Sequence, residues 1–122
     1  MYTEQVLDHF QNPRNAGELV DADVTVEHSN PACDDRLRLQ LKIADGKIVA
    51  AKFKVIGCTP TYACASVMTE MIIGKNVEEA RTIKPETLVA ALGGLSRESM
   101  HASHLAAETL MMAVDKYICD LR

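Results

Sequence analysis

Two successive hydrophobic periods constrain the fold of this 122-residue chain more than any other feature. Apolar and polar residues alternate over 37–43 and again over 48–56, which is the pattern of half-buried β-strands. A third extended stretch is predicted over 24–28, ahead of these two. The dipeptide Asp45-Gly46 between the last two stretches is typical of a two-residue hairpin turn. The sequence therefore predicts three antiparallel strands in sequential order, with one face of the sheet free to receive helices.

From residue 59 onward the hydrophobic period becomes that of a helix. Thr59 and Pro60 suit a helix start, and an apolar stripe then runs to Gly74. The same reasoning predicts four further helices, at 2–10, 77–80, 85–92 and 96–118. A helix, then strands, then helices indicate an α+β fold, a three-stranded antiparallel sheet with helices packed on one face.

Two finer expectations concern the terminal helices. The N-terminal helix is broken by Asn12-Pro13, and we interpret it as a lid or mobile arm. The long C-terminal helix is predicted to bury one stripe of side chains: Ala107, Leu110, Met111, Val114, Ile118 and Leu121.

Composition excludes several classes of function. The chain has 13 Lys+Arg, 17 Asp+Glu and a net charge of −4, and its basic residues form no run, so a nucleic-acid partner is not expected. No apolar run approaches the ~20 residues of a membrane span. The start at Met1 lacks the pattern of a signal peptide, which favours a cytoplasmic location. The length suits one domain, residues 1–122.

Four cysteines raise the question of metal or thiol chemistry, since structural disulfides are rare in a reducing compartment. They lie at positions 33, 58, 64 and 119 and form no Cys-x-x-Cys pair. Cys58 follows the third predicted strand and precedes the helix that begins at Thr59. The unpaired backbone N–H groups at that helix start favour a thiolate, which is both a ligand and a nucleophile.

Potential ligands fall where extended backbone meets a loop or a helix start: Cys33 with Asp35, Cys58, and His101 with His104. We expect Cys33, Asp35, Cys58 and His101 to converge at one end of the sheet. Thiolate, imidazole and carboxylate ligands suit Zn²⁺, and thiolates with imidazole suit iron–sulfur centres. Cys64 is either a core residue of its helix or an additional ligand, and His104 is a possible substitute for His101.

Seven motifs, in order along nearly the whole chain, resemble a known family: Tyr2 to Phe10 with Asn12-Pro13-Arg14-Asn15, Asn30-Pro31-x-Cys33-x-Asp35, Gly57-Cys58, Thr69-Glu70, Gly74-Lys75, Leu92-Gly93-Gly94-Leu95 and His101-x-Ser103-x-Leu105-Ala106. The chain is similar to the iron–sulfur cluster assembly scaffolds of the IscU/NifU N-terminal type. The resemblance implies an α+β scaffold that builds a transient 2Fe-2S cluster and passes it to acceptor proteins, with sulfur supplied by a cysteine desulfurase.

The resemblance also assigns residues. Cys33 and Cys58 match the first two cysteine ligands of the family, Asp35 matches an aspartate that makes the cluster labile, and His101 matches a histidine beside the third cysteine. That third cysteine is Ala102 here. A glycine of the family pattern is Asp34, which tolerates a positive φ less cheaply. The Leu-Pro-Pro-Val-Lys segment through which IscU-type members dock a chaperone is absent.

Three functions compete at this stage. The first is a divergent scaffold that binds iron, zinc or a transient 2Fe-2S cluster and acts through protein partners rather than as an enzyme. The second is a zinc-bound persulfide acceptor that works with a cysteine desulfurase. The third is a metal-free interaction protein whose site has decayed, which the loss of a cysteine at Ala102 favours. A cluster shared between two chains would make a homo-oligomer.

Overall fold

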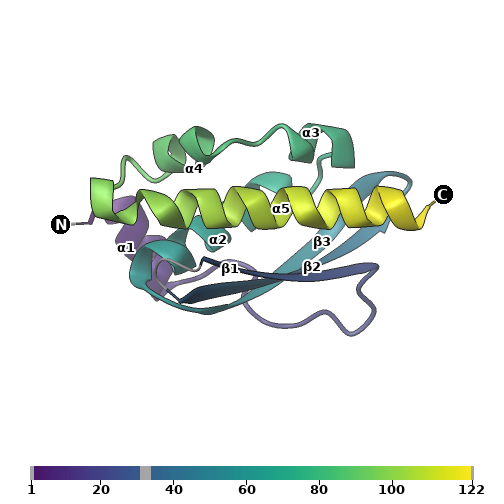
Figure 1. Cartoon of the computed structure of the whole chain (residues 1–122), viewed down its shortest axis with the longest axis horizontal. Coiled ribbons are helices and arrows are strands. Elements are labelled where there is room, and N and C mark those ends of the chain that lie inside the picture. The colour runs from purple at the N-terminus through teal and green to yellow at the C-terminus, as the bar shows by residue number, and fades with distance from the viewer. Residues whose placement is uncertain (1, 31–33, 122) are drawn as a thin grey trace.

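The three predicted strands form one antiparallel sheet in the order β1-β2-β3 (Figure 1). The structure, a computed structural model, describes residues 2–30 and 34–121. Strand β1 spans Val24–Asn30, β2 spans Asp35–Ala44 and β3 spans Lys47–Ile56. The predicted α+β class and strand order are confirmed. Each strand contains its predicted range and extends one or two residues beyond it at one end or both.

The alternating residues of the strands form the floor of the core. Leu37, Leu39 and Leu41 are fully buried, and Phe53 opposite Leu39 is 1 % exposed. Successive side chains of a strand point to opposite faces, so these residues all point toward the helices. Burial of one such leucine contributes roughly 1.5–3 kcal/mol.

The predicted Asp-Gly hairpin is present and sets the pairing of β2 with β3. Asp45 and Gly46 have φ values of 53° and 76°, and Ala44 pairs with Lys47 across the two-residue loop. Two positive φ values in succession match the twist of the flanking strands. The turn therefore places Asp35, at the far end of β2, beside the end of β3.

Helices cover one face of the sheet in two layers (Figure 1). Helices α2 and α5 pack on the strands and on each other, and α3 and α4 pack on α5. Among the described residues, no helix is both long and apolar enough to cross a membrane. The helices and the 3₁₀ turn have these bounds: α1 Glu4–Gln11, α2 Thr59–Ile72, α3 Val77–Arg81, α4 Pro85–Ala91, η1 Arg97–Ser99 and α5 Met100–Asp120.

The buried stripe of α5 differs in part from the predicted one. Ala107, Leu110 and Val114 are buried as expected, but Met111 is 45 % exposed and Leu121 is 68 % exposed. Met111 follows Leu110 by about 100° around the helix, which turns its side chain away from the sheet. Leu121 is the C-cap residue, beyond the last turn.

Helix α1 is docked on α2 rather than free, which does not match its interpretation as a mobile arm. Val6 is fully buried, and the Thr3 hydroxyl donates to the backbone carbonyl of Leu92. Phe10 packs edge to face on Tyr62, with ring centroids 5.6 Å apart. Apolar burial and an aromatic pair together fix the helix on the body of the protein.

Polar contacts extend this docking into the loop after α1. Nδ1 of His9 lies 2.8 Å from the hydroxyl of Ser66 on α2, and the backbone N–H of Arg14 donates to the same hydroxyl (2.9 Å). The guanidinium of Arg14 binds the carboxylates of Asp8 (2.7 Å) and Glu70 (3.7 Å). Burial lowers the pKa of His9 below its ordinary value of 6.5, and the charge of Arg14 lowers it further, against opposing effects of Glu70 and Asp8.

The lowered pKa of His9 predicts a pH-dependent stability. The folded protein disfavours protonated His9, so this contribution to the free energy of unfolding is fully present above pH 6.5 and is lost as the pH falls through 6.5 toward the folded-state pKa. Urea unfolding measured about one pH unit above and below 6.5 should therefore show a smaller acid-induced loss in His9→Gln than in the parent. An equal loss in both proteins would contradict this role, and His104→Gln, which replaces an exposed histidine, is the matched control.

Candidate functional site

The carboxylate of Asp35 lies at the centre of the candidate site. Asp35 is the first residue of β2, is 5 % exposed, and lies on the same strand face as Leu37. Its Oδ2 accepts hydrogen bonds from the Cys58 thiol (3.2 Å) and from the hydroxyl of Thr61. A buried carboxylate needs such partners, because an unpaired charge is costly away from water.

Cys58 reaches this carboxylate because it lies between β3 and α2. It is the N-cap residue of α2, and its carbonyl accepts the backbone N–H groups of Thr61 (3.1 Å) and Tyr62 (3.2 Å). The first N–H groups of a helix have no partner within the helix and carry partial positive charge. The predicted placement of Cys58 at a helix start is therefore confirmed.

His101 enters from the first turn of α5. Its Nε2 lies 4.0 Å from Oδ2 of Asp35, and this buried nitrogen has no hydrogen-bond partner among the described residues. A buried polar atom without a partner is uncommon in native proteins. This nitrogen is thus available as a ligand, and it is directed at a carboxylate that is too distant for a hydrogen bond.

Asp35, Cys58 and His101 each contribute one potential ligand atom, and these three atoms lie within 4.8 Å of one another. Ligand atoms about 2.0–2.3 Å from a tetrahedral metal lie about 3.3–3.8 Å apart. The distances of 3.2 Å and 4.0 Å from Oδ2 bracket this spacing. The three groups therefore suit a single metal ion in both chemistry and separation.

The fourth predicted ligand, Cys33, lies outside the described residues. The turn that follows it is described from Asp34, whose φ is 58° and whose N–H donates to the carbonyl of Asn30 (3.0 Å). This is the left-handed conformation in which the family glycine would be favoured. Asp is one of the residues that tolerates it, so the turn forms without glycine.

The other candidates lie outside the cluster of Asp35, Cys58 and His101. Cys64 is fully buried in the core, and burial raises the pKa of its thiol to about 12, with a smaller effect from Cys58. A cysteine binds a metal as the thiolate, so Cys64 is poorly suited to bind a metal in this fold. Cys119 is exposed near the end of α5, and His104 is exposed one turn beyond His101.

The sequence analysis names Gly57 only as part of a motif and does not name Thr61, so the roles of these two residues in the site come from the structure. A Cβ on Gly57 would lie 2.8 Å from Cγ of Asp35, so glycine is required here for space and not for a positive φ. Thr61, 1 % exposed, donates to Asp35 and lies 3.3 Å from the Cys58 sulfur. Thr61 lies three residues after the N-cap residue Cys58, and this is the spacing at which side chains contact each other in helix caps. That spacing is the sequence signal that could have indicated its contact with Cys58.

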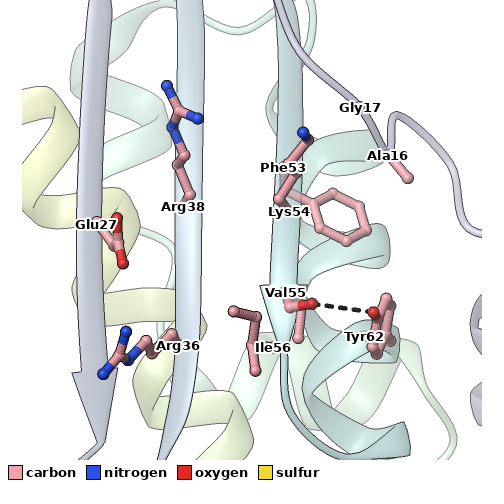
Figure 2. A pocket seen from close by; sticks show the side chains of 10 residues that line it. All are labelled: Ala16, Gly17, Glu27, Arg36, Arg38, Phe53, Lys54, Val55, Ile56 and Tyr62. Carbon is pink, nitrogen blue, oxygen red and sulfur yellow. Dashed lines mark hydrogen bonds between the residues drawn. The ribbon is translucent and has the colours of Figure 1, made fainter.

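A hollow of about 430 Å³ extends from the outer face of the sheet around the edge of β3 to Phe53 and to Tyr62 of α2, and it borders the site (Figure 2). Its lining includes Arg36 and Ile56, which are the neighbours of Asp35 and Gly57 in the chain. Arg38 and Lys54 also line it and share Glu18 as an ion-pair partner. The surface beside the site is therefore both basic and apolar, and none of its lining residues belongs to the metal-ligand cluster.

The contact between Gly57 and Asp35 predicts a specific destabilisation. Gly57→Ala should lower the free energy of unfolding by about 1–3 kcal/mol, because the added methyl group must displace the buried carboxylate. In an Asp35→Ala background the same change should cost much less. Urea unfolding of the four proteins gives the coupling energy directly. Equal costs in the two backgrounds would show that the carboxylate is not what excludes a side chain.

The burial of Cys64 predicts its reactivity. Its pKa of about 12, against an ordinary 9.0, lowers the thiolate fraction at neutral pH by ~1000-fold. Brief alkylation of the folded, metal-free protein should label Cys119 and leave Cys64 unmodified, whereas urea should expose both to label. Peptide mass spectrometry measures this. Labelling of Cys64 at the rate of Cys119 in the folded protein would contradict its placement in the core.

Comparison with known proteins identifies the family and the fold of the chain. The chain is 44 % identical over 117 residues to "Iron-sulfur cluster assembly scaffold protein IscU 1" of Archaeoglobus fulgidus, covering 96 % of this chain and 76 % of that protein. It is 38 % identical over 119 residues to the corresponding IscU protein of Aquifex aeolicus, with the same coverage. The fold matches that of a NifU-like N-terminal protein from Brucella abortus with a TM-score of 0.76 at 19 % identity, over 98 % of this chain and 95 % of the other. The profile described as "NifU-like N terminal domain" matches residues 1–120, and the chain belongs to this family.

Proposed function

We propose that the chain is an iron–sulfur cluster assembly scaffold, formed by a single domain over residues 1–122, that binds iron or a transient 2Fe-2S cluster as cargo. The observation that carries the proposal is the convergence of Asp35, Cys58 and His101 within 4.8 Å. Nε2 of His101 has no hydrogen-bond partner within residues 2–30 and 34–121, which supports the proposal because a bound metal would satisfy this atom. The names of the Archaeoglobus and Aquifex relatives support the same function.

The mixed ligand set fits a cargo that must leave again. Thiolate and imidazole bind iron well, whereas a carboxylate is a harder ligand suited to exchangeable ions. Three side chains leave one position of a tetrahedral metal for sulfide, for Cys33 or for a ligand from another protein. In this scheme Asp35 positions the metal, Cys58 provides the strong bond and His101 completes the described set.

Ala102 sets this chain apart from the family pattern. It is fully buried in the first turn of α5, beside His101, and its methyl group offers no ligand. The proposed site therefore has one thiolate fewer, and a second chain could supply the missing one, which would make a homo-oligomer. The partners proposed from the family are a cysteine desulfurase and acceptor proteins. The basic and apolar hollow next to Asp35 and Gly57 offers a protein partner a surface at the site.

A second candidate function is a zinc-bound persulfide acceptor that works with a desulfurase. The separations of the three ligand atoms favour it as much as they favour iron, because tetrahedral zinc accepts sulfur, nitrogen and oxygen ligands. The metal-free interaction protein is less consistent with the buried Nε2 of His101, which has no partner among the residues that the structure describes, although Ala102 favours it. The cytoplasmic location stays a prediction.

Reconstitution with iron and sulfide under anaerobic conditions tests the proposal. Cys58→Ser should abolish the visible absorbance of the cluster and the bound iron, because it removes the only described thiolate of the site. Cys119→Ser, at the exposed end of α5, is the matched control and should behave as the parent. Ala102→Cys should raise cluster yield or lifetime, since it returns a thiolate beside His101, and Ala102→Ser controls for the added volume.

The metal found separates the candidates. Iron with sulfide in the anaerobically purified protein supports a scaffold, and zinc alone supports the persulfide acceptor. No metal in the purified protein, together with no absorbance after reconstitution of the parent and of Ala102→Cys, would overturn the scaffold proposal. The interaction protein would then be the remaining function.

A further inference from the structure

A second group of metal-ligand residues lies against the side of α5 that faces β1, outside the cluster of Asp35, Cys58 and His101. Nε2 of His28, near the end of β1, lies 3.0 Å from Oε1 of Glu108 on α5. His104 lines the same pocket of about 190 Å³, whose full lining is His28, Ser29, Asn30, His104, Leu105 and Glu108. Such a pocket has room for an ion with several waters. None of its side chains is used by the proposed function.

The backbone presents His104 and Glu108 to the same ion. They are four residues apart on one helix, so their Cβ atoms are about 6 Å apart on one face. Side chains of a helix lean toward its N-terminus, which brings the Glu108 carboxylate over the turn that carries His104. His28 lies on the same face of β1 as the buried Val24 and Val26, toward the helices, and this explains its contact with Glu108.

His28 and Glu108 are already in contact, whereas His104 shares the pocket with them without having its ligand atom in the same cluster. Within the described residues, only the cluster of Asp35, Cys58 and His101 has all its ligand atoms within 4.8 Å. His104 is exposed and also lines the neighbouring hollow against α4, so its ring lies at the edge between the two pockets. Exposed side chains change rotamer within nanoseconds, so an ion bound by His28 and Glu108 can recruit His104.

We propose that His28, His104 and Glu108 bind one divalent first-row transition ion, separately from the Asp35, Cys58 and His101 site. Two imidazoles and one carboxylate with open positions are the ligand set of non-haem ferrous iron. The identification of the ion as Fe²⁺ rests on the proposed function, whereas binding of a divalent ion does not. His104 and His101 are about 4.5 Å apart along the helix axis, and Asn30 of this pocket pairs with Asp35 in the sheet. The pocket therefore lies beside the site of Asp35, Cys58 and His101, and under the proposed function its ion is iron bound ahead of cluster assembly.

Anaerobic titration with Co²⁺, followed by absorption spectroscopy and equilibrium dialysis, tests the proposal. Co²⁺ bound to the thiolate of Cys58 gives an intense sulfur-to-metal charge-transfer band, whereas Co²⁺ at the His28 pocket gives only weak ligand-field bands. The parent should bind two ions. His28→Gln, His104→Gln and Glu108→Gln should each lower the affinity for the second ion by about tenfold or more. None of them should change the charge-transfer band. Glu78→Gln on α3 is the matched control and should bind as the parent does.

The outcomes separate this proposal from the proposed function. Loss of the charge-transfer band in Cys58→Ser with retention of one His104-dependent ion supports two independent sites. Absence of that band in the parent, with the His104-dependent ion present, contradicts the proposed function alone. Unchanged affinity in all three pocket variants overturns the second site. An effect of His104→Gln without effects of His28→Gln and Glu108→Gln also overturns it, because His104 would then serve the first site.

Discussion

The burial of one carboxylate organises the candidate site. Asp35 begins β2 with its side chain directed into the protein, and it is 5 % exposed. Such a group is tolerated only when donors surround it, since each lost partner of a buried charge costs several kcal/mol. The Thr61 hydroxyl and the Cys58 thiol meet this need. Gly57 leaves the space in which the carboxylate sits. The carboxylate needs hydrogen-bond donors, and this need brings the Cys58 thiol close to it. The carboxylate and the thiol together then form two of the three possible metal ligands.

The architecture explains why residues so distant in sequence meet at this carboxylate. The Asp45-Gly46 turn pairs β2 antiparallel to β3, so the start of β2 lies beside the end of β3. The chain leaves β3 through Gly57 and enters α2 at Cys58. Helix α5 packs on both β1 and β2 and places its first turn over the same end. A strand start, a helix N-terminus and the beginning of a long helix thus converge, and each contributes one side chain from rigid backbone.

The sequence predicts the elements well because their signals are local. Alternating leucines and an Asp-Gly dipeptide determine the strands and the hairpin without reference to the rest of the chain. The prediction that Met111 is buried was wrong. Which side of α5 faces the sheet depends on how that helix packs, and the sequence does not give this. The close approach of Gly57 to Asp35 is invisible in the sequence, since it joins the start of β2 to the residue that follows β3. The motif around His9 and Arg14 was recognised only as a resemblance, and its contacts with Ser66 and Glu70 show that it docks α1 on α2.

Two neighbouring residues at the start of α5, His101 and Ala102, bear on how tightly this chain can retain a metal. Ala102 is fully buried in the first turn of α5, and Nε2 of the neighbouring His101 lies 4.0 Å from Oδ2 of Asp35 with no hydrogen-bond partner in the part of the chain that the structure describes. An orphaned polar atom costs about 1–3 kcal/mol in a protein with no ligand bound. That cost is recovered on metal binding and not in the folding of the chain alone. Under the proposed function, Ala102 stands where the resemblance implies a third cysteine, so the imidazole of His101 adds a driving force for metal binding while Cys58 supplies the one strong bond among the described ligands. One strong bond in place of two suits a cargo that must leave again.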